Sequence, residues 1–161
     1  MIGDEPFLPK PPSKFHEDRG RGKSSWRHDK MQAELLAFLR ARSIAGLPAN
    51  AVINREVEAE YPLTKRGQVV SFVDAIEVLD VNLLRFVSAF EVKPEIDSPF
   101  AIVRQAKSSA ELLRHQIKFI AHLDYHLVCD ANDPKLADLR AEWPHVWAWG
   151  VVFDPDTGAT R

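Results

Sequence analysis

The sequence has a single cysteine, no long apolar run and almost no net charge. Cys129 alone cannot form a disulfide within the chain. No stretch approaches the roughly 20 apolar residues that cross a bilayer, and the first residues lack the apolar core of a signal peptide. A formal net charge of −2 gives no global sign of nucleic-acid binding and leaves local basic patches open. We therefore expect a soluble, cytoplasmic protein with no membrane partner.

Length and composition predict one domain behind an N-terminal arm. The 161 residues are 45% hydrophobic, enough for one buried core, and no internal repeat is visible. Residues 1–25 are rich in proline, glycine and charge and cannot bury enough surface to order themselves. We expect a flexible arm over 1–25 and a single domain over 26–161. The arm is either a solvated tail or a basic segment that contacts phosphates.

The first predicted helix carries a carboxylate beside its apolar stripe. Asp29 and Gln32 have the spacing of a capping box, which predicts a helix over 30–42. The stripe consists of Met31, Leu35, Phe38 and Leu39. Glu34 falls among these residues rather than on the polar face. It either pairs with an arginine at the edge of the stripe or reaches toward a functional site.

Two predicted strands follow, joined by a turn at Lys65-Arg66-Gly67. Residues 52–63 alternate apolar and acidic side chains, as expected of a strand with one wet face. Residues 69–79 return as a second strand. Asp74 lies inside that apolar run although aspartate is a poor strand former, so we take it as a site residue. Glu77 is an odd number of residues away and should face oppositely, toward a flank or solvent.

The stretch 83–96 predicts a third strand that ends in charge. Glu91 and Lys93 are two residues apart, so both side chains lie on one face of the strand. Burying an ion is costly unless the ion is paired or meets a metal. Charged residues that occur in an apolar strand against their usual preference are found most often at functional sites.

The remaining chain predicts alternating helices and strands. Ser98 and Pro99 open a helix whose edge includes Gln105, and 125–129 forms a short strand. A helix from Asp133 to about 143 and a strand over 146–153 complete the chain. The predicted order is α, β, β, β, α, β, α, β in an α/β fold, with a mixed sheet covered by helices. The late tryptophans Trp143, Trp147 and Trp149 are either core residues or a base-stacking platform.

The misplaced charges suggest phosphoryl chemistry. Asp74 and Glu91, on neighbouring strands, could together hold a divalent cation by oxygen, which Mg²⁺ prefers. Such an ion neutralises phosphate and lowers the pKa of a bound water. Lys93 can position that water or stabilise charge that develops on the phosphate oxygens. The histidines give no convincing metal-ligand spacing, because His126 of the His122/His126 pair falls in a predicted strand.

Asp74 followed by Glu91-Val92-Lys93, with the surrounding order of elements, resembles the PD-(D/E)xK nuclease superfamily over about 29–130. The resemblance implies a restriction-endonuclease-like αβββαβ core, extended here by a C-terminal helix and strand. It implies that Asp74 and Glu91 bind Mg²⁺ or Mn²⁺ and that Lys93 is the catalytic lysine. Glu34 matches a helix glutamate of some members, and Gln105 matches a glutamine after the lysine strand.

The expected activity is hydrolysis of DNA by an endonuclease in repair, restriction or mobile-element biology, with RNA left open. Val73 stands where many members have proline, and Ser109 takes the tyrosine position of exonuclease-like members, which disfavours that branch. A homodimer is expected from the resemblance only. The alternative is an inactive nuclease-like fold that binds nucleic acid or protein.

A second acidic-x-Lys triplet, Asp133-Pro134-Lys135, is explained as a helix start. The purely structural interpretation of the candidate site is a Glu91–Lys93 ion pair with Asp74 capping a turn.

Overall fold

The computed structural model describes residues 25–44, 46–47, 49–142 and 147–151. In chain order the elements are α1 (Ser25–Ala41), β1 (Ile53–Lys65), β2 (Gln68–Val81), β3 (Leu84–Lys93), α2 (Pro99–Gln116), β4 (Ile120–Asp130), α3 (Leu136–Glu142) and β5 (Trp147–Val151). This order confirms the predicted α, β, β, β, α, β, α, β arrangement. The predicted arm lies almost wholly outside the described residues, as do the side chains of Trp143, Trp147 and Trp149.

The strands form one mixed sheet in the order β1-β2-β3-β4-β5. The first three strands pair antiparallel, whereas β3 with β4 and β4 with β5 pair parallel. Consecutive strands are therefore neighbours throughout, and α2 provides the crossover that a parallel β3–β4 pair requires. The protein is an α/β fold with a mixed sheet, as the sequence predicts.

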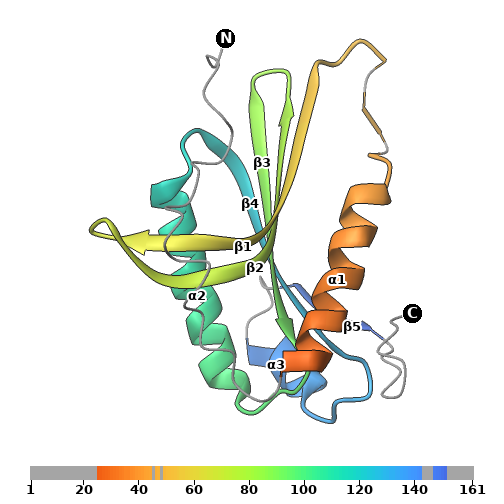
Figure 1. Cartoon of the computed structure of the whole chain (residues 1–161), viewed down its shortest axis with the longest axis vertical. Helices are drawn as coiled ribbons and strands as arrows, with labels where there is room; N and C mark the ends of the chain where they lie inside the picture. Colours follow the sequence, from red (N-terminus) through yellow and green to blue (C-terminus); the bar gives the residue numbers. More distant parts are fainter. Residues whose placement is uncertain (1–24, 45, 48, 143–146, 152–161) are drawn as a thin grey trace.

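The two long helices cover opposite faces of the sheet (Figure 1). On one face, α1 packs through Met31 and Leu39 onto β2, β3 and β4, where it meets Ala75, Phe90 and Val92. On the other, α2 contributes a larger cluster that includes Ile102, Val103, Ala106 and Leu113. Because helices cover both faces, the central strands are buried on both sides.

The turns follow local chemistry. Lys65 pairs with Gln68, so Arg66 and Gly67 alone form the β1–β2 turn, with φ of 51° and 76°. Positive φ at both central residues is the geometry that matches the twist of a hairpin, and glycine adopts it freely. Ser98 caps α2 by accepting a hydrogen bond from the Ala101 amide at 3.3 Å, as predicted.

Several boundaries differ from the predictions. The first helix begins at Ser25 rather than near 30, so Asp29 lies within the helix and the predicted capping box is wrong. β4 extends over 11 residues instead of five, and α3 is shorter than predicted. In β1, Glu60 has a φ of 50°, so Val57 joins the cluster under α1 while Tyr61 joins the cluster under α2. A single alternating face over 53–63 is therefore also wrong.

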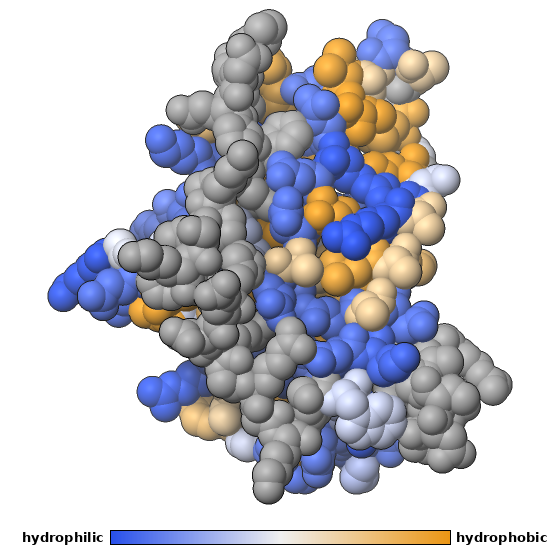
Figure 2. Space-filling view, in the orientation of Figure 1, coloured by the Kyte–Doolittle hydropathy of each residue, from blue (hydrophilic) through white to orange (hydrophobic). Residues whose placement is uncertain are grey.

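Hydrophobic side chains gather at the end of the molecule where β1 begins (Figure 2). Val52 and Ile53 are exposed there, and Leu83 and Leu84 are exposed at the turn between β2 and β3. These segments lie together because the Asn82 amide donates to the Val52 carbonyl at 2.8 Å. Among the described residues, no helix combines the length and apolar character of a transmembrane span.

Candidate active site

Asp74 lies where β2 and β3 stop pairing. The ladder between these strands runs from Val81–Leu84 to Ala75–Phe90, and Asp74 is the next residue of β2. In place of a further ladder bond, the Val92 amide donates to Asp74 Oδ2 at 2.7 Å. The side chain is almost fully buried, with 3% of the residue exposed. Asp74 is thus held directly beside the strand end that carries Glu91 and Lys93.

α1 supplies two groups to Asp74. His28 Nε2 lies 3.0 Å from Asp74 Oδ1, and the Gln32 side-chain amide donates to the Asp74 carbonyl at 2.8 Å. Residues four apart share one face of a helix, so both groups reach β2 from the same side. The hydrogen bond to Asp74 raises the pKa of His28, against the opposing effect of burial. The carboxylate therefore favours the protonated imidazole more than water does in a free histidine.

Glu91 and Lys93 form a second cluster at the same strand end. Glu91 is 5% exposed, and its Oε1 lies 2.9 Å from Lys93 Nζ. Tyr125 of β4 donates its hydroxyl proton to Glu91 Oε2 at 3.1 Å, and Lys93 Nζ lies 3.5 Å from Gln105 Oε1 of α2. Burial, followed by the charge of Glu91, raises the pKa of Tyr125 well above its usual value. Tyr125 therefore remains a hydrogen-bond donor at neutral pH.

The structure brings four of the five predicted site residues to this region: Asp74, Glu91, Lys93 and Gln105. Glu34 is not among them. Its side chain is exposed, whereas Gln32 is buried against Asp74. Two residues correspond to a rotation of about 200° around a helix, so Glu34 points to the opposite side of α1.

Glu77 is buried rather than facing a flank or solvent, which corrects the prediction. It is 5% exposed and forms ion pairs with Arg42, after α1, and with Arg55 of β1. Alternation along β2 does place the Glu77 side chain on the opposite face of the sheet from the residues before and after it. That face is covered by α1 and the segment that follows α1. Three residues further, Asp80 is also buried and accepts two hydrogen bonds from Arg85, at 2.9 and 3.0 Å.

The sequence did not single out His28, Gln32 or Tyr125 as site residues. If the start of the helix at Ser25 had been recognised, His28 would have been placed one turn before Gln32. The sequence gives no clear sign of that start, because the first turn of the helix contains no acidic residue. Tyr125 had a usable signal, because a tyrosine within an apolar strand needs a partner for its hydroxyl group. The partner, Glu91, comes from the neighbouring strand and is found only once the register is known.

Two carboxylates suit a hard cation. Mg²⁺ is commonly held by one or two protein carboxylates and completes its shell with water and phosphate oxygens. Within the described ranges, no group of three or more His, Cys, Asp or Glu side chains is arranged to hold a metal. Asp74 and Glu91 together provide the smaller donor set that Mg²⁺ accepts. Each would have to exchange one of its present partners, His28 for Asp74 and Lys93 or Tyr125 for Glu91.

No protein-family model matches the chain, and no curated protein matches it either.

Proposed function

We propose that the chain is a metal-dependent nuclease of the PD-(D/E)xK type that hydrolyses phosphodiester bonds in DNA. The observation that carries the proposal is the hydrogen bond from the Val92 amide to Asp74. Val92 is the central residue of the Glu-Val-Lys triplet, so this bond fixes an acidic residue of one strand beside the triplet of the next. The order of elements and the mixed sheet agree with the αβββαβ core of that superfamily.

In the proposed mechanism, Asp74 and Glu91 would hold Mg²⁺ or Mn²⁺. The bound ion supplies charge neutralisation at the phosphate and a more acidic water. Lys93 is the most accessible of the three groups, with 24% of its side chain exposed. Its ammonium group can orient the attacking water or stabilise negative charge on the phosphate oxygens. Gln105 of α2 lies next to this ammonium group, with its Oε1 3.5 Å from Lys93 Nζ.

A second candidate function follows from the saturation of the same carboxylates. All four oxygens of Asp74 and Glu91 contact protein groups: His28, the Val92 amide, Lys93 and Tyr125. A closed network of this kind also suits a nuclease-like fold that binds nucleic acid, or a partner protein, without cutting. The two functions differ in whether any product forms.

The test is cleavage of plasmid and branched DNA with Mg²⁺ or Mn²⁺. Lys93→Ala should reduce the rate by at least about 100-fold, as expected when one group that stabilises the transition state is removed. Lys135→Ala is the matched control, because Lys135 belongs to the other acidic-x-Lys triplet. There, Asp133 accepts hydrogen bonds from the Ile96 and Lys135 amides and organises a turn.

Lys135→Ala should therefore cut at the wild-type rate. Circular dichroism and thermal melting must show that both variants fold. Absence of product at every metal concentration, with metal-independent DNA binding, would favour the second function. An equal loss of cleavage rate in both variants would show that Lys93 has no specific role in catalysis.

A further inference from the structure

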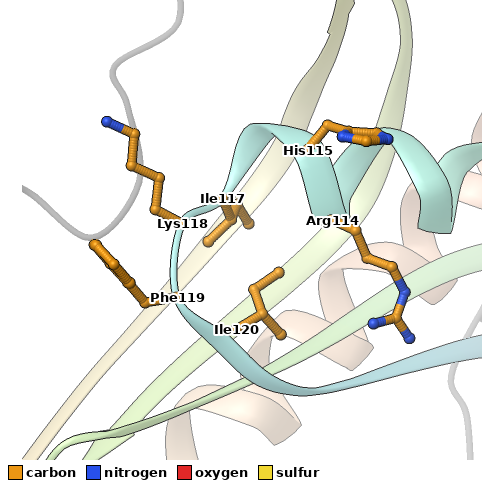
Figure 3. Close-up of a pocket in the computed structure, with 6 residues that line it drawn as sticks. All are labelled: Arg114, His115, Ile117, Lys118, Phe119 and Ile120. Atoms are coloured by element: carbon orange, nitrogen blue, oxygen red, sulfur yellow. The ribbon is translucent and has the colours of Figure 1, made fainter.

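An open cavity of about 490 Å³ lies where α2 passes into β4, away from the candidate site. Its lining residues are Arg114, His115, Ile117, Lys118, Phe119 and Ile120. In Figure 3, the side chains of Ile117 and Ile120 lie between Arg114 on one side and Lys118 and Phe119 on the other. The cavity thus combines an apolar floor, basic side chains and an exposed aromatic ring.

The loop that forms this cavity is fixed from inside the protein. Arg85 is 5% exposed and donates a hydrogen bond to the Lys118 carbonyl at 3.0 Å. The same guanidinium group binds both carboxylate oxygens of Asp80. On the helix side, the Ile117 amide donates to the Leu113 carbonyl at 2.9 Å. The backbone of this loop is therefore held in one position by buried groups.

Phe119 adopts an unfavourable conformation at the tip of the loop. Its φ is 61°, a region that bulky side chains rarely occupy. The residue is 73% exposed, so packing against the core does not compensate for the strain. Strained residues of this kind concentrate at functional sites, and an exposed large apolar ring has its own hydration cost.

We propose that this cavity binds single-stranded nucleic acid, with a base stacked on Phe119 and phosphates contacted by Arg114, His115 and Lys118. Single-strand sites combine basic side chains with aromatic rings that stack on unpaired bases. A duplex would not offer a free base face to the ring. Glu111, one turn earlier on α2, is exposed and marks the limit of the basic surface on that side.

This binding surface does not depend on the proposed cleavage. β4 carries Ile120 at the cavity and Cys129 beside Lys93, so about 30 Å of strand separates the two regions at about 3.3 Å per residue. Binding can be measured without metal, and a chain that proves unable to cut can still bind. Failure of one proposal therefore leaves the other standing.

The test is fluorescence anisotropy of the full chain with labelled oligo(dU) and oligo(rU) of about 15 nucleotides, in EDTA. Phe119→Gly should weaken binding by roughly ten-fold or more, the equivalent of losing one stacked base. Glycine tolerates positive φ, so the melting temperature of this variant should not fall. Phe100→Ala is the control, because Phe100 is 64% exposed at the other end of α2 and should bind as wild type.

Salt dependence tests the phosphate contacts. Lys118→Gln should reduce the slope of log K against log salt by about 0.7, the value for one phosphate contact with a single strand. Lys135→Gln, beyond the far end of β4, should leave the slope unchanged. Preference for one oligonucleotide would show that the sugar is also recognised, and equal binding would restrict recognition to phosphate and base. The proposal is overturned if neither oligonucleotide binds at low salt, if Phe119→Gly binds as wild type, or if a duplex binds equally well.

Discussion

Two groups of buried charge on β2 differ in their partners. Toward the turn between β2 and β3, Glu77 and Asp80 are paired with arginines, whose guanidinium groups offer several donors to a carboxylate. In the middle of β2, where its pairing with β3 stops, Asp74 contacts His28 and a backbone amide, and nearby Glu91 contacts a lysine and a tyrosine. The side-chain partners among these can be exchanged for another ligand. Burial alone therefore does not mark a functional carboxylate, whereas an exchangeable partner does.

The two groups also differ in which elements of the fold their partners connect. Arg85 connects Asp80 to the Lys118 carbonyl, and Arg55 connects Glu77 to the Leu39 and Arg42 carbonyls at the end of α1. The arginines thus join elements across the sheet. Lys93 instead ends its strand with part of its side chain in solvent. We infer that the arginine-paired group stabilises the fold and that the Asp74–Glu91–Lys93 group is available for chemistry.

The largest expected effect is on stability and comes from the arginine-paired group. Arg85→Met leaves the buried Asp80 carboxylate without its partner, which should cost about 3–5 kcal/mol in the free energy of unfolding. Replacing both partners, as in Asp80→Leu with Arg85→Met, should recover much of that loss, because two apolar side chains leave no uncompensated charge. Urea unfolding measures both variants.

Lys65→Met, at an exposed position, provides the baseline for that measurement and should change stability by less than about 0.5 kcal/mol. If Arg85→Met were no more destabilising than this control, the two groups of charge would not differ in the way inferred.

The second effect is a pH dependence near the candidate site. His126 stacks on Phe90, with ring centroids 4.6 Å apart, and burial lowers its pKa from 6.5 to about 4. A depressed pKa means that the unfolded chain binds the proton more readily. The contribution to stability is therefore fully present above pH 6.5 and is lost as the pH falls toward 4, by about 3 kcal/mol at most.

Melting temperatures between pH 4 and 7 measure this effect. His126→Asn should flatten the curve, while His122→Asn, an exposed position on the same strand, should follow wild type. Parallel curves for all three proteins would show that His126 is not the residue responsible.

The order of elements was predictable because local signals were strong. Pro99 after Ser98 fixed the start of α2, and Arg66-Gly67 fixed the first hairpin. The different structural contexts of the two acidic-x-Lys triplets were also predictable from the sequence. Glu91 and Lys93 end an apolar strand, whereas Asp133 precedes a helix and, in the structure, accepts amide hydrogen bonds in a turn.

The partners of the buried charges were not predictable. Glu77 pairs with Arg42 and Arg55, which lie far from it in the chain and meet it only through the strand register and the position of α1. Glu34 was placed near the site because the phase of α1 was judged from a stripe of hydrophobic residues alone. That stripe is weakly defined, since Phe38, one of its members, is 61% exposed.

The smallest effect tests whether Tyr125 belongs to the candidate site or to the structural pairs. Tyr125→Phe removes the hydroxyl group that holds Glu91 Oε2 but leaves the ring in the core. Partners that orient metal ligands typically change metal affinity by about 10–100-fold, and we expect about ten-fold here. The readout is the Mn²⁺ concentration that gives half of the maximal thermal stabilisation, which requires no cleavage.

Tyr61→Phe is the matched control for this variant. Tyr61 is also buried, and its hydroxyl oxygen accepts a hydrogen bond from Gln116 rather than contacting a site residue. Both variants should lose about 1 kcal/mol of stability with the hydrogen bond. Of these two variants, only Tyr125→Phe should shift the Mn²⁺ requirement, because Tyr125 contacts Glu91 and the Tyr61 hydroxyl group contacts Gln116. If the two tyrosine variants respond identically to Mn²⁺, the Tyr125–Glu91 contact belongs with the arginine pairs as a structural feature of the sheet.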